Sequence, residues 1–198
     1  MDIRIKRLTS WETCVELARR TMWKEGTGRE PTSDWKRRIV LAAHSPIYSV
    51  LFQVDWDGIP RWIADEFVRH HVGATPYMSS QRPDRCPDAT PREERPQTAP
   101  VNLTMVLNAQ SFLDISRKRL CCQAAPEARE TWARTLEVLK ETGETELYDH
   151  CVPECVHQGG FCPEMRCCGM CPPNDGRTVK IWKKLKGEIV EDGGREHE

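Results

Sequence analysis

Two polar runs in the middle of the chain have the side chains needed to bind an anionic ligand. The first is Arg69-His70-His71, and the second is residues 80–85, which contain two more arginines. Guanidinium groups offer paired N–H donors that match a phosphate, and imidazole rings add further donors. The two runs could therefore gather around a phosphate or an electron-rich ring. The alternative is that Arg69, His70 and His71 form the solvated end of a helix.

A third polar set follows at Asn108 and Gln110 and continues to Asp114 and Arg119. On one continuous helix Asn108 and Arg119 would share a stripe and lie roughly 16 Å apart. This spacing suits the two ends of an extended ligand. An ordinary polar helix face, with Phe112 packed beside it, is the alternative interpretation.

Cysteines crowd into residues 151–171, with His150 and His157 among them. Four thiolates, or three thiolates and one imidazole, complete a tetrahedral zinc site. The predicted metal ligands are Cys151, Cys155, Cys162 and Cys168. Reduced unpaired thiols and disulfides are the alternatives, because the spacing lacks paired CxxC motifs. The single CxxC, at 168–171, has no thioredoxin-like context, which disfavours redox catalysis.

Composition excludes several classes of protein. The 198 residues carry 29 Lys plus Arg against 30 Asp plus Glu, so no global basic field points to nucleic acid or an anionic membrane as a partner. No apolar run approaches the roughly 18 residues of a membrane span, and the charged start is unlike a secretion signal. The ten cysteines are too few and too clustered for a chain-wide disulfide framework, which favours a reducing compartment. The basic stretch at 177–186 is read as a solvated face.

These side chains must be positioned by a mixture of helices and strands. Hydrophobic periodicity, capping residues and turn residues predict both kinds of element. The expected elements are strands at 2–7 and 48–56 and helices at 9–22, 31–43, 59–71, 101–124 and 126–143, with a capping box at Thr9-Ser10-Trp11-Glu12 and a turn at Asp57-Gly58. Residues 72–100 contain six prolines and are expected to be irregular. Because strands and helices do not alternate regularly, we expect an α+β fold.

Taken in order, these segments resemble the flavin-dependent thymidylate synthases, in particular a divergent, phage-like branch of that family. The resemblance covers about residues 40–170. It is carried by His44-Ser45-Pro46, Val68-Arg69-His70-His71, Ser80-Gln81-Arg82, Arg92 to Gln97, Asn108-Ala109-Gln110, Arg119-Leu120, Glu127-Ala128-Arg129, Pro153-Glu154-Cys155 and Phe161-Cys162-Pro163-Glu164. The resemblance implies an antiparallel sheet with packed helices, to which the chain adds a Cys-rich C-terminal extension. The expected organisation is a synthase-like domain at 1–145, a Cys-rich segment with a candidate zinc site at 146–175, and a tail at 176–198.

The resemblance also implies a reaction. In that family FAD carries a hydride from NADPH, methylenetetrahydrofolate supplies the one-carbon unit, and deoxyuridine monophosphate (dUMP) is methylated to dTMP without a protein nucleophile. The implied nucleotide-binding residues are Arg69, Ser80, Gln81, Arg82, Arg92 and Arg119, of which Arg119 and Ser80 are the implied catalytic residues. The implied FAD-binding residues are His44, Ser45, His70, His71, Asn108, Gln110 and Asp114. A homotetramer with active sites between subunits is implied as well, in the cytoplasm of a bacterium or a phage-infected cell.

Two other functions are consistent with the sequence. The family usually has Ser where Ala74 stands and Tyr where Pro83 stands, so the same fold and cofactor could serve a hydroxymethylation or a different pyrimidine nucleotide. Residues 151–186 alternatively suggest a zinc-stabilised module that binds nucleotide or nucleic acid without turnover.

Overall fold

The structure is a computed structural model that describes residues 1–86 and 90–174. It divides into two compact units, Met1–Pro153 and Glu154–Glu198. The predicted tail at 176–198, with the basic stretch at 177–186, lies outside the described residues. The first unit extends beyond residue 145, where the predicted synthase-like domain ends.

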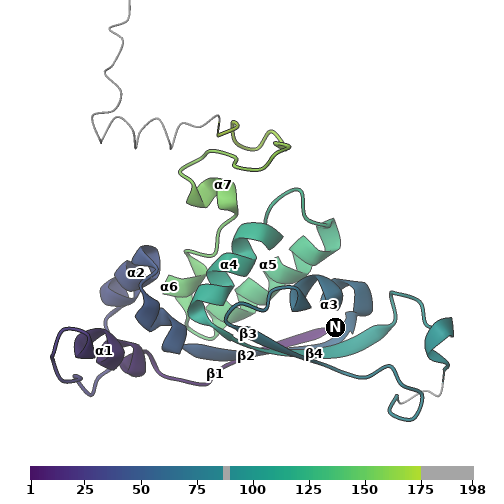
Figure 1. Cartoon of the computed structure of the whole chain (residues 1–198), viewed down its shortest axis with the longest axis horizontal. Coiled ribbons are helices and arrows are strands. Elements are labelled where there is room, and N and C mark those ends of the chain that lie inside the picture. The colour runs from purple at the N-terminus through teal and green to yellow at the C-terminus, as the bar shows by residue number, and fades with distance from the viewer. Residues whose placement is uncertain (87–89, 175–198) are drawn as a thin grey trace, which may run out of the picture. The chain divides into compact units, whose positions relative to one another are not determined.

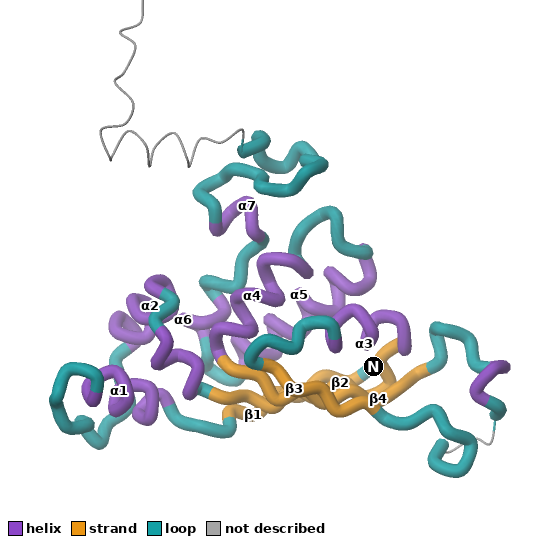
Figure 2. Tube along the Cα trace, in the orientation of Figure 1, coloured by secondary structure: helices purple, strands orange, loops and turns teal. Residues whose placement is uncertain are grey.

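The first unit is built on a four-stranded antiparallel sheet with helices packed on it, as Figure 2 shows, so the predicted α+β fold is confirmed. The strand order is β1-β2-β4-β3. The strands are β1 (Asp2–Arg7), β2 (Leu51–Pro60), β3 (Ala74–Met78) and β4 (Pro100–Asn108). β4 is a central strand, and it leads directly into the helix that carries much of the predicted site.

One face of the sheet makes the hydrophobic core. Alternate residues of β2 and β4 are buried, because successive side chains of a strand point to opposite faces. Figure 1 shows this face covered by α3 (Arg61–Val68), α4 (Ala109–Arg119) and α5 (Pro126–Glu141). Phe112 of α4 packs edge-on against Phe52 with ring centroids 5.3 Å apart, and Trp132 of α5 donates to the Ser116 hydroxyl at 2.9 Å. These contacts fix α4 over the sheet.

The remaining elements of this unit are α1 (Trp11–Arg20), α2 (Ser33–Ala42), the 3-10 turns η1 (Ser45–Ser49) and η2 (Arg92–Glu94), and α6 (Thr145–Tyr148). Glu144, just before α6, is buried and accepts from the Trp11 indole at 2.8 Å and from Arg7 at 2.7 Å. A buried carboxylate needs such partners. These bonds tie the start of the chain to its helical layer.

Several expected elements are correct in kind but shifted. The capping box is expected to begin at Thr9, but Ser10 is the N-cap of α1, and its hydroxyl accepts from the Thr13 backbone. Strand β2 begins at Leu51, because residues 45–49 form the 3-10 turn η1. The expected turn at Asp57-Gly58 is wrong: the strand continues through a register shift between Trp56 and Ile59. Ile59 therefore belongs to β2, and the next helix starts at Arg61.

Two expectations about the middle of the chain are wrong. The predicted helix at 101–124 is a strand followed by a shorter helix, because Val101, Leu103, Met105 and Leu107 alternate on the buried face of β4. Asn108 and Arg119 consequently do not share one helical stripe, since Asn108 precedes α4. Residues 72–100 are not wholly irregular, since they contain β3 at the edge of the sheet, where the central Pro76 is tolerated.

The second unit contains α7 (Glu154–His157) and a short parallel bridge between Cys162 and Pro173. Among the described residues of the whole chain, none of the helices combines the length and the apolar character that crossing a membrane requires.

Candidate functional site

Four polar side chains converge where α3 and α4 end, and we call them the helix-end cluster: Glu66 of α3, Arg69 and His70 directly after it, and Arg119 of α4. Arg119 donates from Nε to His70 Nε2 at 2.9 Å and from Nη1 to Glu66. The other carboxylate oxygen of Glu66 pairs with Arg69 at 3.2 Å. The side chain of Arg119 is only 14% exposed, whereas that of Arg69 is 69% exposed. One guanidinium is thus rigidly held and the other faces solvent.

His70 is held in its neutral form. Burial, reinforced by the positive charge of Arg119, lowers the pKa of His70 to about 4. Because Arg119 donates to Nε2, that nitrogen must be the acceptor, so the proton of the neutral ring is on Nδ1. Near neutral pH His70 therefore orients Arg119 without adding charge to the cluster.

The depressed pKa of His70 predicts a pH dependence of stability. The unfolded chain binds a proton near pH 6.5, whereas the folded chain binds it only near pH 4, so stability should fall as the pH drops through this window. His70→Gln, which cannot titrate, should lose less stability between pH 7 and pH 4.5. The difference should be on the order of 1 kcal/mol, allowing for the partial exposure of the ring. Denaturant titrations at both pH values measure it, and parallel losses in the two proteins would contradict the assignment.

The start of α4 is fixed by a close approach of two chain segments. The side chain of Asn108 caps the helix by accepting from the Ser111 backbone at 2.9 Å. The Ser111 hydroxyl donates to the Gly73 carbonyl at 2.8 Å. Gly73 has a φ of +67°, and a Cβ there would lie 2.4 Å from Asn108 Nδ2. Only glycine fits this position, which places the His70-His71 segment beside α4.

The polar face of α4 continues this arrangement. Asp114 accepts from Gln110 Nε2 and from Arg117, each at 2.9 Å. Its negative charge also acts to raise the pKa of the nearby His70, against the larger effects that lower it. The Oε1 atom of Gln110 is buried and, among the described residues, has no hydrogen-bond partner. A buried acceptor without a donor is costly, so this atom suits the N–H or O–H of a ligand.

A separate polar group lies in the segment after β3. Gln81 accepts from Arg61 at 2.9 Å, and Arg82 makes a two-pronged ion pair with Asp84 at 3.0 Å. The backbone of Arg82 also donates to the Ser80 hydroxyl at 3.2 Å. This segment borders a pocket of about 720 Å³, which we call the loop pocket. Its lining residues are Ser79, Ser80, Gln81, Arg85, Cys86, Thr90, Arg95, Pro96, Ala99, Pro100, Val101 and Asn102.

The loop pocket and the start of α4 lie at opposite ends of β4. The loop pocket includes Pro100 and Val101, where β4 begins, whereas α4 starts where β4 ends, at Asn108. Nine residues of strand span about 27 Å at about 3.3 Å per residue. The contacts of one chain bring Arg69, His70 and Arg119 together and place Gln110 and Asp114 on the neighbouring face of α4. Among the described residues, Ser80, Gln81 and Arg82 do not contact this group; α3 lies between, with Arg61 binding Gln81 and Glu66 binding Arg119.

The other predicted residues are more peripheral within this chain. Arg92 is exposed on η2, and His71 is exposed, with Nδ1 3.0 Å from the Arg69 carbonyl. His44 and Ser45 are exposed at the start of η1, which packs against α4. None of these positions is tested by the contacts of a single chain, so their roles remain predictions.

The sequence assigns no role to several residues that organise these groups. Glu66 joins Arg69 and Arg119, and the only local sign of this is its spacing of three residues from Arg69 on a helix. Arg61 holds Gln81 from the start of α3, and Ser111 holds Gly73. No sequence spacing indicates these contacts, because each joins distant segments.

The predicted metal ligands fall in both units. Cys151 belongs to the first unit, where burial raises the pKa of its thiol to about 12 beside the Ser116 hydroxyl. Cys155, Cys162 and Cys168 belong to the second unit. Among residues 1–86 and 90–174, no three His, Cys, Asp or Glu side chains are already arranged around a cation. The zinc site thus stays a prediction.

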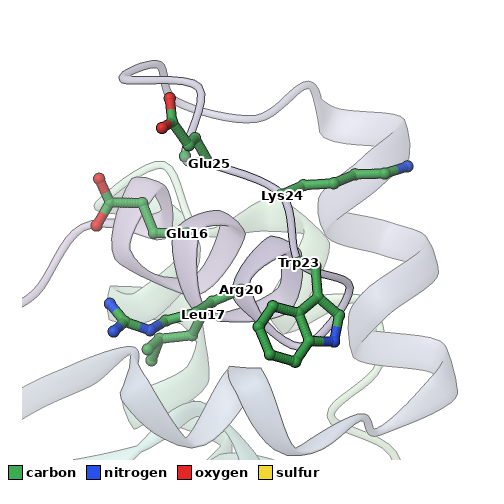
Figure 3. Close-up of a pocket in the computed structure, with 7 residues that line it drawn as sticks. Glu16, Leu17, Arg20, Trp23, Lys24 and Glu25 are labelled. Carbon is green, nitrogen blue, oxygen red and sulfur yellow. The ribbon is translucent and has the colours of Figure 1, made fainter.

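A second hollow of about 720 Å³ lies between the end of α1 and the loop that follows it (Figure 3). Its lining includes Glu16, Leu17, Arg20 and the fully exposed Trp23. No residue of the helix-end cluster or of the loop pocket takes part in it.

Comparison with known proteins identifies the fold. No protein-family model and no curated protein matches the sequence. Among solved structures, the flavin-dependent thymidylate synthase ThyX of Helicobacter pylori, complexed with FAD and dUMP, matches with a TM-score of 0.60 and 16% identity over 77% of this chain and 100% of that one. A second structure of the same synthase with FAD and dUMP gives a TM-score of 0.58 and 15% identity over 76% and 99% of the two chains. The chain therefore has the fold of the flavin-dependent thymidylate synthases, as the resemblance implied.

Proposed function

We propose that this protein is a flavin-dependent thymidylate synthase, which converts dUMP to dTMP with methylenetetrahydrofolate as one-carbon donor and NADPH as reductant. The proposal rests on the fold shared with synthases that bind FAD and dUMP, together with the ordered site residues. The observation that carries it is the helix-end cluster, in which a nearly buried Arg119 is oriented by Glu66 and a neutral His70.

This arrangement suits a pyrimidine nucleotide. Arg119 uses Nε and Nη1 to contact its neighbours, and among the described residues no partner of its Nη2 group is found. In a site that excludes water, a fixed guanidinium stabilises negative charge that builds up on a pyrimidine ring when its carbon attacks the one-carbon donor. Arg69 is paired with Glu66 but largely exposed, so its guanidinium can also contact the phosphate of the nucleotide.

The residues present also fit a flavin. The unpartnered Oε1 of Gln110 can accept from a ring N–H or a ribityl hydroxyl, while Asp114, one turn further along α4, lies near His70. With Asn108, and with His44, Ser45 and His71 from neighbouring segments, these side chains would hold FAD. When bound, FAD supplies the hydride chemistry, and the protein orients the partners and excludes water.

The contacts of one chain leave the loop segment outside the helix-end cluster. Gln81 is bound by Arg61 at the start of α3, and Arg82 is bound by Asp84, so neither side chain contacts Arg119. We propose that the loop segment of one subunit, with Arg92, meets the helix-end cluster of another in a homotetramer. Ser80 would then join Arg119 at the reacting pyrimidine. Such an enzyme would act in the cytoplasm of a bacterium or a phage-infected cell.

The test is direct. The purified protein should carry a yellow chromophore with flavin absorbance, and it should release tritium from dUMP labelled at carbon 5 only when methylenetetrahydrofolate and NADPH are present. The matched control is the same mixture without the folate. Binding of dUMP with neither flavin nor tritium release would instead indicate a module that binds nucleotide without turnover.

A second candidate keeps the cofactor and changes the product. Asp84 already engages two nitrogens of Arg82, so the loop segment differs from one that offers a free guanidinium to dUMP. An enzyme for another pyrimidine nucleotide would fit this pairing, and the altered segment at residues 74–83 also suggests a hydroxymethylase. The mass of the product separates the candidates, since a hydroxymethyl group is heavier than a methyl group by one oxygen.

A further inference from the structure

An exposed tryptophan lines the hollow at the end of α1, and the proposed reaction does not use it. Trp23 is fully exposed, and its neighbour Met22 and Leu17 of α1 are exposed as well. Large apolar side chains that gather on one surface mark an interaction site, and tryptophan and methionine are enriched in interfaces between proteins. We call the lining of the hollow the α1 patch; its side chains are Glu16, Leu17, Arg20, Trp23, Lys24 and Glu25 (Figure 3).

The backbone holds Trp23 in a fixed and unfavourable conformation. Its φ is +57°, in the left-handed region that a bulky residue rarely adopts. The Trp23 N–H donates to the Arg20 carbonyl at 3.2 Å, and the side chain of Arg19 donates to the Glu25 carbonyl across the loop. Because Trp23 is fully exposed, no packing within the chain offsets this strain. An aromatic side chain preorganised in this way is suited to burial by a partner.

The charges of the α1 patch are balanced and lack partners within the chain. Among residues 1–86 and 90–174, no ion pair or side-chain hydrogen bond of Glu16, Arg20 or Lys24 is found. With Glu25, two acidic and two basic side chains line one hollow, which matches neither a purely anionic nor a purely cationic ligand. A surface that carries both signs matches a copy of itself, because across a twofold axis each acidic group can face a basic group.

The order of the charges along α1 fits such a pair. Glu16 and Arg20 are four residues apart, so they lie on one face of the helix. If two copies of α1 pack antiparallel across a twofold axis, Glu16 of each copy faces Arg20 of the other. Leu17 and Trp23 then supply the apolar contact beside these ion pairs.

We propose that the α1 patch binds the α1 patch of a second copy of this protein around a twofold axis. Trp23 would be the anchor of this interface, since buried tryptophans contribute most to many interfaces between proteins. The inference goes beyond the proposed function, which needs several subunits but gives no role to this surface. Association through the patch requires neither flavin nor nucleotide.

Sedimentation of the intact chain over a range of concentrations tests the proposal. The wild type should associate, and Trp23→Gly should form a smaller assembly at the same concentration, with a dissociation constant raised by at least about 30-fold. Glycine favours the left-handed φ, so this variant should fold as well as the wild type by circular dichroism. The control Met165→Ala, which shortens a fully exposed apolar side chain of the second unit, should leave the assembly unchanged.

Two charge reversals test the twofold arrangement. Glu16→Arg and Arg20→Glu should each weaken association alone, because like charges then face one another across the axis. A mixture of the two variants should associate again, since the basic patch of one meets the acidic patch of the other. Neither single variant alters the exposed tryptophan, so this rescue depends on the pairing of the charges.

Several results would overturn the proposal. A wild type that remains a single chain at every concentration would do so, and so would association that Trp23→Gly leaves intact. If the mixed charge variants stayed apart, the patch would not face itself across a twofold axis. Sedimentation measures neither flavin absorbance nor tritium release, so the interface and the proposed enzymatic function can fail separately.

Discussion

Replacing Arg119 by Lys is expected to lower kcat/KM for tritium release from dUMP by about 100-fold or more, equivalent to about 2.7 kcal/mol. Lysine keeps the positive charge but loses the forked geometry that lets one guanidinium bind Glu66 and His70 and still face a ligand. Flavin should remain bound, while the change that dUMP causes in the flavin spectrum should disappear. Steady-state tritium release and difference absorbance measure the two effects.

The matched control is Arg134→Lys, which makes the same change on an exposed position of α5. It should leave turnover and flavin absorbance unchanged. If Arg119→Lys retained the turnover of the wild type, the helix-end cluster would not be the nucleotide site, even though the chain has the fold of these synthases.

Gly73→Ala is expected to lower the free energy of unfolding by about 2–4 kcal/mol. The left-handed φ of +67° is unfavourable for alanine, and the new methyl group would lie 2.4 Å from Asn108 Nδ2 and 2.7 Å from Ser111 Oγ. Relieving that overlap requires the cap of α4 to move. Because Asn108 is also a proposed flavin ligand, flavin affinity should fall together with stability. Denaturant unfolding and flavin titration measure the two losses.

Gly143→Ala measures the cost of the left-handed backbone conformation alone, without the steric overlap that Gly73→Ala adds. Gly143 has a similar φ of +88°, but nothing lies within 4 Å of its would-be Cβ. This substitution should cost only about 1–2 kcal/mol and leave flavin affinity unchanged. Equal losses in the two variants would mean that the contact of Gly73 with Asn108 and Ser111 contributes little.

Much of the fold is predictable from local pattern. Periodicity predicts the strand at 2–7, and proline at a helix start predicts the helix from Pro126; both are confirmed. Strand β4 is not predicted, although its buried residues alternate. Its leucine, methionine and asparagine residues continue without a break into α4, and side-chain type alone does not mark where an extended backbone becomes helical. The Asp57-Gly58 bulge is mistaken for a turn because a turn and a bulge use the same residues.

The sequence predicts which residues belong to the candidate site better than it predicts how they are arranged. The residue types at 69–70 and 108–119 are each also those of a solvated helix end or an ordinary polar face, and it is their order along the chain and the family resemblance that imply anion and ring contacts. The fold brings several of these side chains together. That Ser80 and Arg82 do not contact this group within one chain is not predictable, because it depends on contacts between distant segments, such as that of Arg61 with Gln81.

The edges of the sheet constrain how copies of this protein can associate. Outer strand β3 has Pro76 at its centre, where the chain lacks an N–H, and the other outer strand, β1, alternates Asp2, Arg4 and Lys6 with apolar residues. Such edges resist pairing with a strand of another molecule. Oligomers should therefore form through broad faces and helical surfaces and not by extending the sheet, which also guards the chain against fibrous aggregation.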